Sequence, residues 1–403
     1  MHSIVLAVFI CVYLGMILGE IPGLRLDRAG IALLGAIALV ALGQTTAVRA
    51  WASVDVNTIA LLFGLMIASA QFRLFGFYTW ITSRLARAGL EPPELLGWVV
   101  ALAGVLSALL ANDIVCLAMT PPVVELARKR SLDPVPYLLG LACAANVGSA
   151  ATLIGNPQNM LIGQALKLSF HGYLAEGGVP AILGLGLVWG VVAWMWRGRW
   201  AGPGAVPQVA AVPFNRWQTL KATLVLLGVI TAFILGPWPH GAVALAGAGI
   251  LLTSRRMGSR EVLGLVDWQL LVLFMGLFVV NAALQETGLA GQGMQHLATW
   301  GLNLRDPRML FGAAALLSNL VSNVPAVMLL LPAAGHRLAG PILALASTFA
   351  GNFILVGSVA NMIVVDQAKQ VGVEVDWRTH AKVGIPVTLG TLALAAGWLA
   401  FLA

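Results

Sequence analysis

One short pattern occurs twice in this chain, about half its length apart. In each half an apolar segment places an Asn nine residues before a Pro, at Asn112 and again at Asn323. Further along, an apolar triplet ends in a Gly that precedes an Asn-Met pair by four residues, at 153–155 and at 355–357. A duplicated apolar unit interrupted by Gly, Pro and Asn is typical of secondary transporters, in which the interrupted segments meet at the binding site.

The composition restricts the chain to a membrane. Of its 403 residues, 59% are hydrophobic and 10% are charged, whereas a soluble domain carries roughly 25% charged residues. Apolar runs of about 20 residues recur along the whole length and are long enough to cross a bilayer as helices. The amino terminus lacks the basic start of a signal peptide, so we expect residues 3–19 to form the first span.

The predicted fold is an all-α polytopic membrane protein. Two apolar segments, 94–129 and 307–337, have a polar break at the middle and are predicted to be re-entrant hairpins, because irregular backbone at membrane depth must line a cavity or be buried. Segments 74–88 and 288–302 are predicted to lie at the interface. The crossings are expected at 3–20, 29–48, 54–72, 135–167 (broken), 176–196, 217–236, 240–254, 267–285, 340–366 (broken) and 382–402.

Each half then holds five crossings and one hairpin. Because five is odd, residues 217–403 are predicted to form a repeat that is inverted relative to residues 1–197. The Arg-, Gly- and Pro-containing segment 198–216 is the predicted cytoplasmic linker. With both termini outside, 18 of the 23 Lys and Arg residues fall in cytoplasmic loops, and the five outside are Arg49, Lys167, Arg305, Arg308 and Arg337. This bias predicts a multi-pass protein of the inner (plasma) membrane, and it explains the net charge of +7 without nucleic acid.

The four breaks are predicted to be helix starts. Asn112 and Asn323 are expected to cap the second arms of the hairpins, and Asn156 and Ser358 the second halves of the broken helices. Each start leaves unpaired N–H groups and about half a positive charge. Four starts that meet at the midplane predict a site for an anion or an oxygen-rich solute that needs no Lys or Arg. The alternative is ordinary kinks in a helical bundle.

Asp113 is an acid inside an apolar hairpin. Acids within a membrane commonly mark ion or proton pathways, so we expect Asp113 to carry a proton; the alternative is a permanently ionised carboxylate that only fixes the turn. Val324 stands at the matching place in the second hairpin. Asp55 and Asp267 begin spans and are predicted to be helix caps.

Two of the three cysteines lie close to the breaks in sequence. Cys116 follows Asn112 by four residues, and Cys143 precedes Asn146 by three. Two thiols near one site suit a thiophilic metalloid, whereas the simpler interpretation is that both are small core residues. No spacing indicates a disulfide or a zinc site, and no Ser/His/Asp arrangement indicates an enzyme.

The break segments 111–113, 148–159 and 322–325 resemble the ion transporter superfamily. This superfamily includes the arsenite-efflux permeases (ArsB type), NhaD-type sodium/proton antiporters and dicarboxylate/sodium symporters. The pair Asn112-Asp113 is most similar to the arsenite-efflux branch, whereas the dicarboxylate branch carries Ser-Asn-Thr at both hairpin tips. The resemblance implies a homodimer in which the hairpins and broken helices move, by an elevator motion, against a scaffold of residues 3–72 and 217–285. In the arsenite-efflux branch it also implies an ATPase subunit as a partner.

The sequence therefore predicts a secondary active transporter for a small inorganic solute, with proton-coupled efflux of arsenite, antimonite or a related oxyanion favoured. A sodium/proton antiporter and a sodium-coupled anion or dicarboxylate symporter are the alternatives. No cofactor is expected, and the coupling ion is the proton, or else sodium. The predicted binding residues are Asn112, Asp113, Asn156, Asn159, Ser322, Asn323, Ser358 and Asn361, with Asp113 as proton carrier and Cys116 and Cys143 as candidate thiol contacts.

Overall fold

The computed structural model describes residues 2–19, 26–202, 213–254 and 257–403. Within these ranges the protein is helical, with connecting turns and loops and one isolated antiparallel bridge between Leu132 and Ala201.

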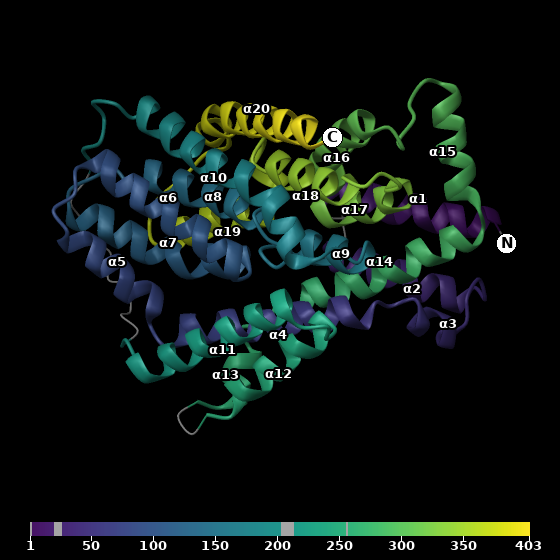
Figure 1. Ribbon diagram of the computed structural model, residues 1–403, viewed down its shortest axis with the longest axis horizontal. Coiled ribbons are helices and arrows are strands. Elements are labelled where there is room, and N and C mark those ends of the chain that lie inside the picture. Colours follow the sequence, from purple (N-terminus) through teal and green to yellow (C-terminus); the bar gives the residue numbers. More distant parts are fainter. Residues whose placement is uncertain (1, 20–25, 203–212, 255–256) are drawn as a thin grey trace.

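The two halves contain the same order of α-helices (Figure 1). The first half holds α1 (His2–Leu18), α2 (Arg28–Ala41), α3 (Ala47–Ala52), α4 (Val56–Leu74), α5 (Phe77–Arg87), α6 (Pro92–Leu109), α7 (Asn112–Lys129), α8 (Val135–Ser149), α9 (Pro157–Ala165) and α10 (Phe170–Met195). The second half holds α11 (Arg216–Leu235), α12 (His240–Leu252), α13 (Ser259–Leu263), α14 (Trp268–Glu286), α15 (Leu289–Thr299), α16 (Pro307–Val321), α17 (Asn323–Leu330), η1 (Leu331–Ala333), α18 (Ala339–Ala350), η2 (Leu355–Gly357), α19 (Val359–Gln370) and α20 (Trp377–Leu402).

The observed helices follow the predicted segments. Both hairpins are present, as α6 with α7 and α16 with α17, and both broken helices are present, as α8 with α9 and α18 with α19. In the described part of the chain, six helices are long and apolar enough to cross a membrane, and seven apolar helices are shorter. The all-helical polytopic class is therefore confirmed. Linker residues 203–212 and the cations Arg25, Arg255 and Arg256 lie outside the described residues.

The largest boundary error is at the second span, which is predicted to end at 48 but ends as α2 at Ala41; the last helix of each half differs in the opposite way, by starting early. Helices α10 and α20 begin at Phe170 and Trp377, before the predicted starts at 176 and 382. In both cases a polar residue caps the earlier turn: Ser169 accepts from the N–H of Gly172, and Asp376 accepts from the N–H of Thr379. A capped polar turn extends these helices beyond the apolar segment that sequence hydropathy detects.

The helices form two groups; in Figure 1 most of the first lies at the bottom and the second at the top, while α1 of the first group is drawn level with α17. The frame group contains α1–α4 and α11–α14, in which α4 packs on α12 and α14 packs on α2. The break group contains α6–α10 and α16–α20, in which α6 packs on α8, α16 on α18, α7 on α19 and α10 on α20. Helices α5 and α15 connect the groups along the chain. All four breaks therefore belong to one group.

Two glycines at equivalent places let frame helices cross closely. A Cβ built on Gly64 of α4 would lie 2.6 Å from the backbone carbonyl carbon of Ala244 in α12. A Cβ built on Gly276 of α14 would lie 2.6 Å from the same atom of Ala32 in α2. Because only a residue without a Cβ tolerates this approach, the glycines fix two matching helix crossings.

The predicted helix caps at the start of α4 and α14 are confirmed. The Asp55 carboxylate accepts from the N–H of Thr58 at 2.8 Å, and the Asp267 carboxylate accepts from the N–H of Leu270 at 2.9 Å. Both acids therefore satisfy the orphan N–H groups of the helix start.

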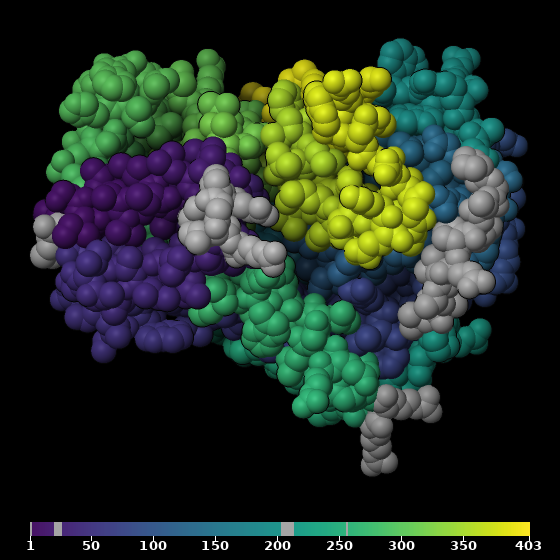
Figure 2. Space-filling model, turned by 180° about the vertical axis from the view of Figure 1, so that it is seen from behind, coloured from purple at the N-terminus to yellow at the C-terminus, as the bar shows by residue number. Residues whose placement is uncertain are grey.

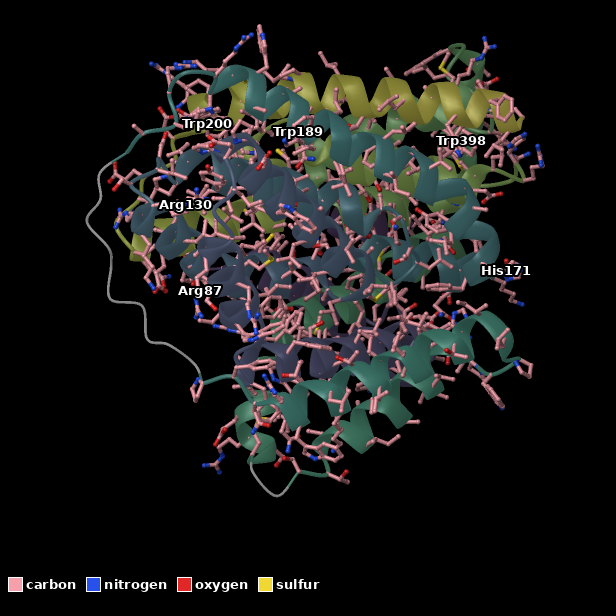
Figure 3. All side chains as sticks on the ribbon, turned by 60° about the vertical axis from the view of Figure 1, so that its left-hand side comes forward. Arg87, Arg130, His171, Trp189, Trp200 and Trp398 are labelled. Atoms are coloured by element: carbon pink, nitrogen blue, oxygen red, sulfur yellow. The ribbon has the colours of Figure 1, made fainter. Side chains whose placement is uncertain are left out.

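The surface has the pattern of a membrane protein. Figure 3 shows Arg87, Arg130 and Trp200 toward one side of the molecule, with His171 and Trp398 toward the opposite side. Figure 2 shows the opposite face from Figure 1, where the purple helix α1 lies against the later helices; α1 contacts α14 and α16. Most of the strongly exposed tryptophans lie at or beside helix ends, as expected for an interfacial aromatic belt; Trp98, within α6, is the exception, and the others are Trp51, Trp194, Trp217, Trp238, Trp268, Trp300 and Trp377.

Candidate functional site: the breaks and their cavity

The tip of the first hairpin is a two-residue break between α6 and α7. The prediction that Asn112 caps α7 is wrong, because Asn112 is the first residue of the helix and Ala111 takes the cap position without a side-chain hydrogen bond. The N–H of Asn112 donates to the Gly155 carbonyl at 3.2 Å, which brings the first hairpin to the first broken helix. Its side chain donates from Nδ2 to Oδ1 of Asn146 at 3.4 Å, so the amide links two segments instead of closing its own turn.

The tip of the second hairpin is a single residue, Ser322. It has a φ of 76°, in a region that non-glycine residues rarely adopt. The prediction that Asn323 caps α17 is wrong, because Asn323 lies in the helix and Ser322 holds the cap position. Asn323 instead accepts at Oδ1 from the Ser318 hydroxyl at 2.5 Å, across the tip from α16. Ser322 and Asn323 are both half-buried.

Both hairpins contact the frame group at or near their tips. The N–H of Ala111 donates to Oγ of Ser69 in α4 at 3.2 Å. At the second tip the Tyr13 hydroxyl lies 3.3 Å from the Pro325 carbonyl and 3.1 Å from Oδ1 of Asn281 in α14, as donor to both. The second contact therefore involves residues of two frame helices, α1 and α14, whereas the first involves only Ser69 of α4.

The broken helices restart at residues 156–157 and 358–359. The predicted Asn156 cap is confirmed, since Oδ1 of Asn156 accepts from the N–H of Asn159 at 2.9 Å and Pro157 is the first helical residue. Ser358 holds the matching position before α19 but makes no capping hydrogen bond. Its hydroxyl donates to Oδ1 of Asn146 at 2.8 Å, so the predicted cap contact is replaced by one to the other half of the chain.

Asn146 joins the breaks, although it is not among the binding residues predicted from the sequence. Its Oδ1 accepts from Asn112 and from Ser358, and its Nδ2 donates to Oδ1 of Asn352 at 2.7 Å and to Oδ1 of Asn361 at 3.0 Å. The residue is 1% exposed. An Asn inside the apolar segment of α8 is the sequence signal that could have identified it, because a buried side-chain amide can form up to four hydrogen bonds and must find partners for them.

The remaining amides at the breaks are buried and hydrogen-bonded within the protein. Asn159 donates from Nδ2 to the Thr152 carbonyl at 2.9 Å, and Asn361 donates from Nδ2 to the Gly351 carbonyl at 3.0 Å. A Cβ on Gly351 would lie 3.4 Å from Nδ2 of Asn323, so the second hairpin tip adjoins the second broken helix. The structure thus brings all four breaks together, while solute binding by these amides stays a prediction.

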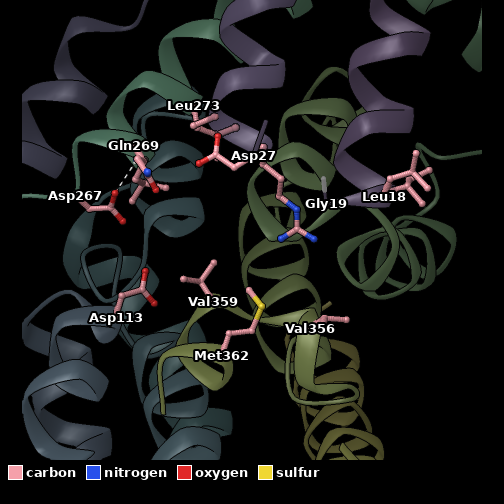
Figure 4. Close-up of a pocket in the computed structure, with 14 residues that line it drawn as sticks. Leu18, Gly19, Asp27, Asp113, Asp267, Gln269, Leu273, Val356, Val359 and Met362 are labelled. Carbon is pink, nitrogen blue, oxygen red and sulfur yellow. Dashed lines mark hydrogen bonds between the residues drawn. The ribbon is translucent and has the colours of Figure 1, made fainter. Parts of the chain in front are cut away.

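A cavity of about 550 Å³ lies between the frame group and the break group (Figure 4). Figure 4 shows Asp113 across this cavity from Asp27 and Asp267, which cap α2 and α14. Among the described residues no hydrogen bond or ion pair reaches the Asp113 carboxylate. Of the eight predicted binding residues, Asp113 alone lines the cavity. The polar and charged lining residues are Asp27, Arg28, Asp113, Asp267 and Gln269, with Val356, Val359 and Met362 from the second break and α19.

The candidate thiols lie outside the cavity lining. Cys116 and Cys143 are fully buried, and neither contributes to the walls of this cavity. The Cys143 carbonyl accepts from Nδ2 of Asn352 at 3.3 Å, which is a backbone role. Among the described residues no group of three or more His, Cys, Asp or Glu side chains is placed to hold a metal ion. Thiol contact with a solute stays a prediction.

The two hairpin tips differ in one pair of polar groups. In the second hairpin Ser318 and Asn323 are hydrogen-bonded to each other. The matching residues of the first hairpin are Ser107 and Asn112, and within the described structure Oγ of Ser107 and Oδ1 of Asn112 are buried without a hydrogen-bond partner. Buried oxygens of this kind are costly unless another group satisfies them. They stand in the same hairpin as Asp113.

Relatives of the chain include named transporters. It is 29% identical to the silicon efflux transporter LSI3 of Oryza sativa subsp. japonica, with 93% of each chain covered. It is 28% identical to a 46 kDa membrane protein of Mycobacterium leprae, covering 99% of this chain and 98% of the relative. It is 30% identical to the inner membrane protein YbiR of Escherichia coli, covering 82% and 85%.

Solved structures share the fold at low sequence identity. The YdaH transporter of Alcanivorax borkumensis matches with a TM-score of 0.59 at 16% identity, over 99% of this chain and 98% of that one. MtrF of Neisseria gonorrhoeae, described among antimetabolite efflux pumps, matches with a TM-score of 0.53 at 12% identity, over 98% and 93%.

A family model described as citrate transporter (CitMHS) matches residues 13–350, most of the chain. The predicted superfamily is thereby confirmed. The chain belongs to the citrate transporter family, within the superfamily of ArsB- and NhaD-like permeases, and is a membrane transporter rather than an enzyme.

Proposed function

We propose that this protein is a proton-coupled secondary transporter that exports a small inorganic solute, with a neutral metalloid hydroxo acid such as arsenite favoured. The observation that carries the proposal is Asp113, a carboxylate in a membrane hairpin that faces a cavity and makes no hydrogen bond or ion pair among the described residues. Intramembrane acids in this setting serve as proton or ion carriers. Asp113 binds a proton in one state of the transporter and releases it in the other.

The charge of the cavity lining supports a neutral cargo. Three acids, Asp27, Asp113 and Asp267, face one base, Arg28. A multiply charged carboxylate such as citrate would enter a site of like charge, which disfavours binding. A neutral hydroxo acid meets no such repulsion and donates hydrogen bonds to carboxylate oxygens. The name of the rice relative, silicon efflux transporter LSI3, refers to export of silicon, which like arsenic is a metalloid.

The proposed mechanism is an elevator motion within two inverted repeats, 1–197 and 217–403. The frame group builds the face of a homodimer and stays in place, while the break group moves across the membrane. The positive-inside distribution puts Asp27 and Asp267 on the cytoplasmic side. The cavity beside them then belongs to a cytoplasm-facing state, from which Asp113 releases its proton when solute enters. Asn112 and Asn361 do not line the cavity themselves, but each precedes a residue that does, Asp113 and Met362.

Growth of an arsenite-sensitive strain tests the proposal. A strain that lacks its own arsenite export is given this chain, or an empty plasmid, and grown on graded arsenite and antimonite. The proposal expects higher tolerance with the chain. Unchanged tolerance to both, at confirmed membrane expression, rejects the metalloid cargo.

A second candidate function is sodium/proton antiport. The unpartnered oxygens of Ser107 and Asn112, in the hairpin of Asp113, favour it, because carbonyl, hydroxyl and carboxylate oxygens are the ligands of hard cations. Sodium and lithium tolerance is measured in parallel in a strain without its own sodium extrusion. Growth rescue there, without arsenite rescue, selects this alternative.

A further inference from the structure

We infer that Asn146 is a positioning residue for transport: it holds the first turn of α19 against the tip of the first hairpin, so that both form one wall of the cavity. The inference rests on the proposed function, since it assigns the cavity as the transport site. Asn146 itself lies behind the wall and does not line the cavity.

Three of the four hydrogen-bond partners of Asn146 are next to a cavity residue in the chain, and the fourth, Asn352, is not. Asn112 precedes Asp113, and Ser358 precedes Val359. Asn361, the third partner, precedes Met362, which also lines the cavity. The hydrogen bonds from Asn146 therefore set the relative position of side chains that come from sequence positions more than two hundred residues apart.

The fold contains a matching contact that serves as an internal comparison. Thr348 of α18 corresponds to Asn146, and Asn156 corresponds to Ser358, both at the offset of 202 residues that separates the two broken helices. Oγ1 of Thr348 accepts from Nδ2 of Asn156 at 3.3 Å, as Oδ1 of Asn146 accepts from Ser358. Each half therefore holds the helix start of the other half.

The two contacts differ in what lies beside them. The residues that follow Asn156 do not line the cavity, whereas those that follow Ser358 do. Asn146 also gathers four hydrogen bonds from three segments, while the Thr348 hydroxyl receives two, from Asn156 and from Gln158. Both residues are about 1% exposed. Thr348 is therefore a control for the loss of a buried polar group, because it is as buried as Asn146 but its partners do not adjoin the cavity wall.

Thiol labelling of the cavity wall tests the inference without any substrate. The reporter is Val359→Cys, at a half-exposed cavity position, in a chain whose Cys11, Cys116 and Cys143 are replaced by Ser or Ala. Inside-out vesicles are treated with a membrane-impermeant maleimide. Asn146→Ala is expected to change the labelling rate by about tenfold, because loss of a buried hydrogen-bond network shifts a local equilibrium by that order. The control Thr348→Val is expected to stay within about twofold of the parent.

Ser358→Ala keeps the test valid where Asn146→Ala fails to fold, since it removes one hydrogen bond of the network and should change labelling in the same direction. The inference is overturned if Asn146→Ala and Thr348→Val change the labelling rate equally. It is also overturned if neither Asn146→Ala nor Ser358→Ala changes the labelling rate. A second readout is arsenite uptake into inside-out vesicles whose parent chain keeps Val359 and all three native cysteines; there Asn146→Ala should raise KM more than it lowers the maximal rate. Absence of arsenite uptake by the parent chain rejects the proposed cargo, while the labelling result still decides the role of Asn146.

Discussion

At the residue scale, the chemistry of this protein is divided between a carboxylate that faces the cavity and amides that do not. Asp113 is free of partners among the described residues, whereas Asn146, Asn159 and Asn361 are buried and bonded to protein atoms. Acids within a membrane commonly bind and release protons as part of function, whereas hydrogen-bonded buried amides fix geometry. The two kinds of residue therefore predict different mutant behaviour.

Replacement of Asp113 by Asn should abolish the pH dependence of transport while the protein still folds, because the amide keeps the shape and loses the titratable group. The measurement is flux across an imposed pH gradient, beside size-exclusion profiles of the purified variant. The Asp55→Asn variant, altered at a helix cap away from the cavity, should keep the pH dependence. Full gradient-driven flux in Asp113→Asn would remove this residue from the proton path.

Loss of the Asn156 side chain should destabilise the protein more than loss of another helix cap. Asn215 caps α11 through the N–H of Gln218 alone, so Asn215→Ala should cost about 1 kcal/mol. Asn156 also donates to Ser149 and Thr348, and Asn156→Ala should cost roughly 2–3 kcal/mol. Thermal melting in detergent compares the two; a larger effect at Asn215 would contradict this ranking.

At the element scale, the chain shows which parts of the fold its sequence predicts. Hydropathy located the helices and both hairpins, because apolar length and polar breaks are local features. The helix caps predicted at Asn112 and Asn323 are wrong, since the side chains of these residues form hydrogen bonds with Asn146 and Ser318 instead. Asn146 was missed because its partners Asn352 and Asn361 are far away in the chain. Contacts of that kind depend on packing, which no local pattern reports.

Because of the close helix crossings in the frame group, we expect the cost of a Gly→Ala substitution to depend strongly on the position of the glycine. Gly64→Ala should lower thermal stability by several degrees, on the order of 1–3 kcal/mol, because its Cβ meets the Ala244 backbone. Gly249 lies in the same helix as Ala244 and has open space around it, so Gly249→Ala should be neutral or slightly stabilising. Melting temperatures of both variants check this, and equal values would show that the crossing tolerates a Cβ.

The second hairpin should loosen when its contact with the frame group is removed. Tyr13→Phe deletes the hydroxyl that reaches Pro325 and Asn281, and a buried hydrogen bond of this kind contributes about 1 kcal/mol. Hydrogen exchange in α17 should become several-fold faster, with little change in α7. A matched loss of protection in both hairpins would indicate general destabilisation instead.

At the scale of the whole molecule, two similar halves meet in one break group, and a cavity separates that group from the frame at Asp113. The proposed transport follows from this arrangement only when the break group exposes Asp113 to the two sides in turn. In the proposed exchange the solute enters only when Asp113 has released its proton, so that solute and proton cross in opposite directions.

The most direct test is arsenite flux in proteoliposomes of the purified protein, with the lumen more acidic than the medium. The proposal predicts accumulation of arsenite in the lumen as protons leave, and loss of that accumulation when a protonophore collapses the gradient. Equal arsenite entry with and without the pH gradient would contradict proton-coupled transport through this site.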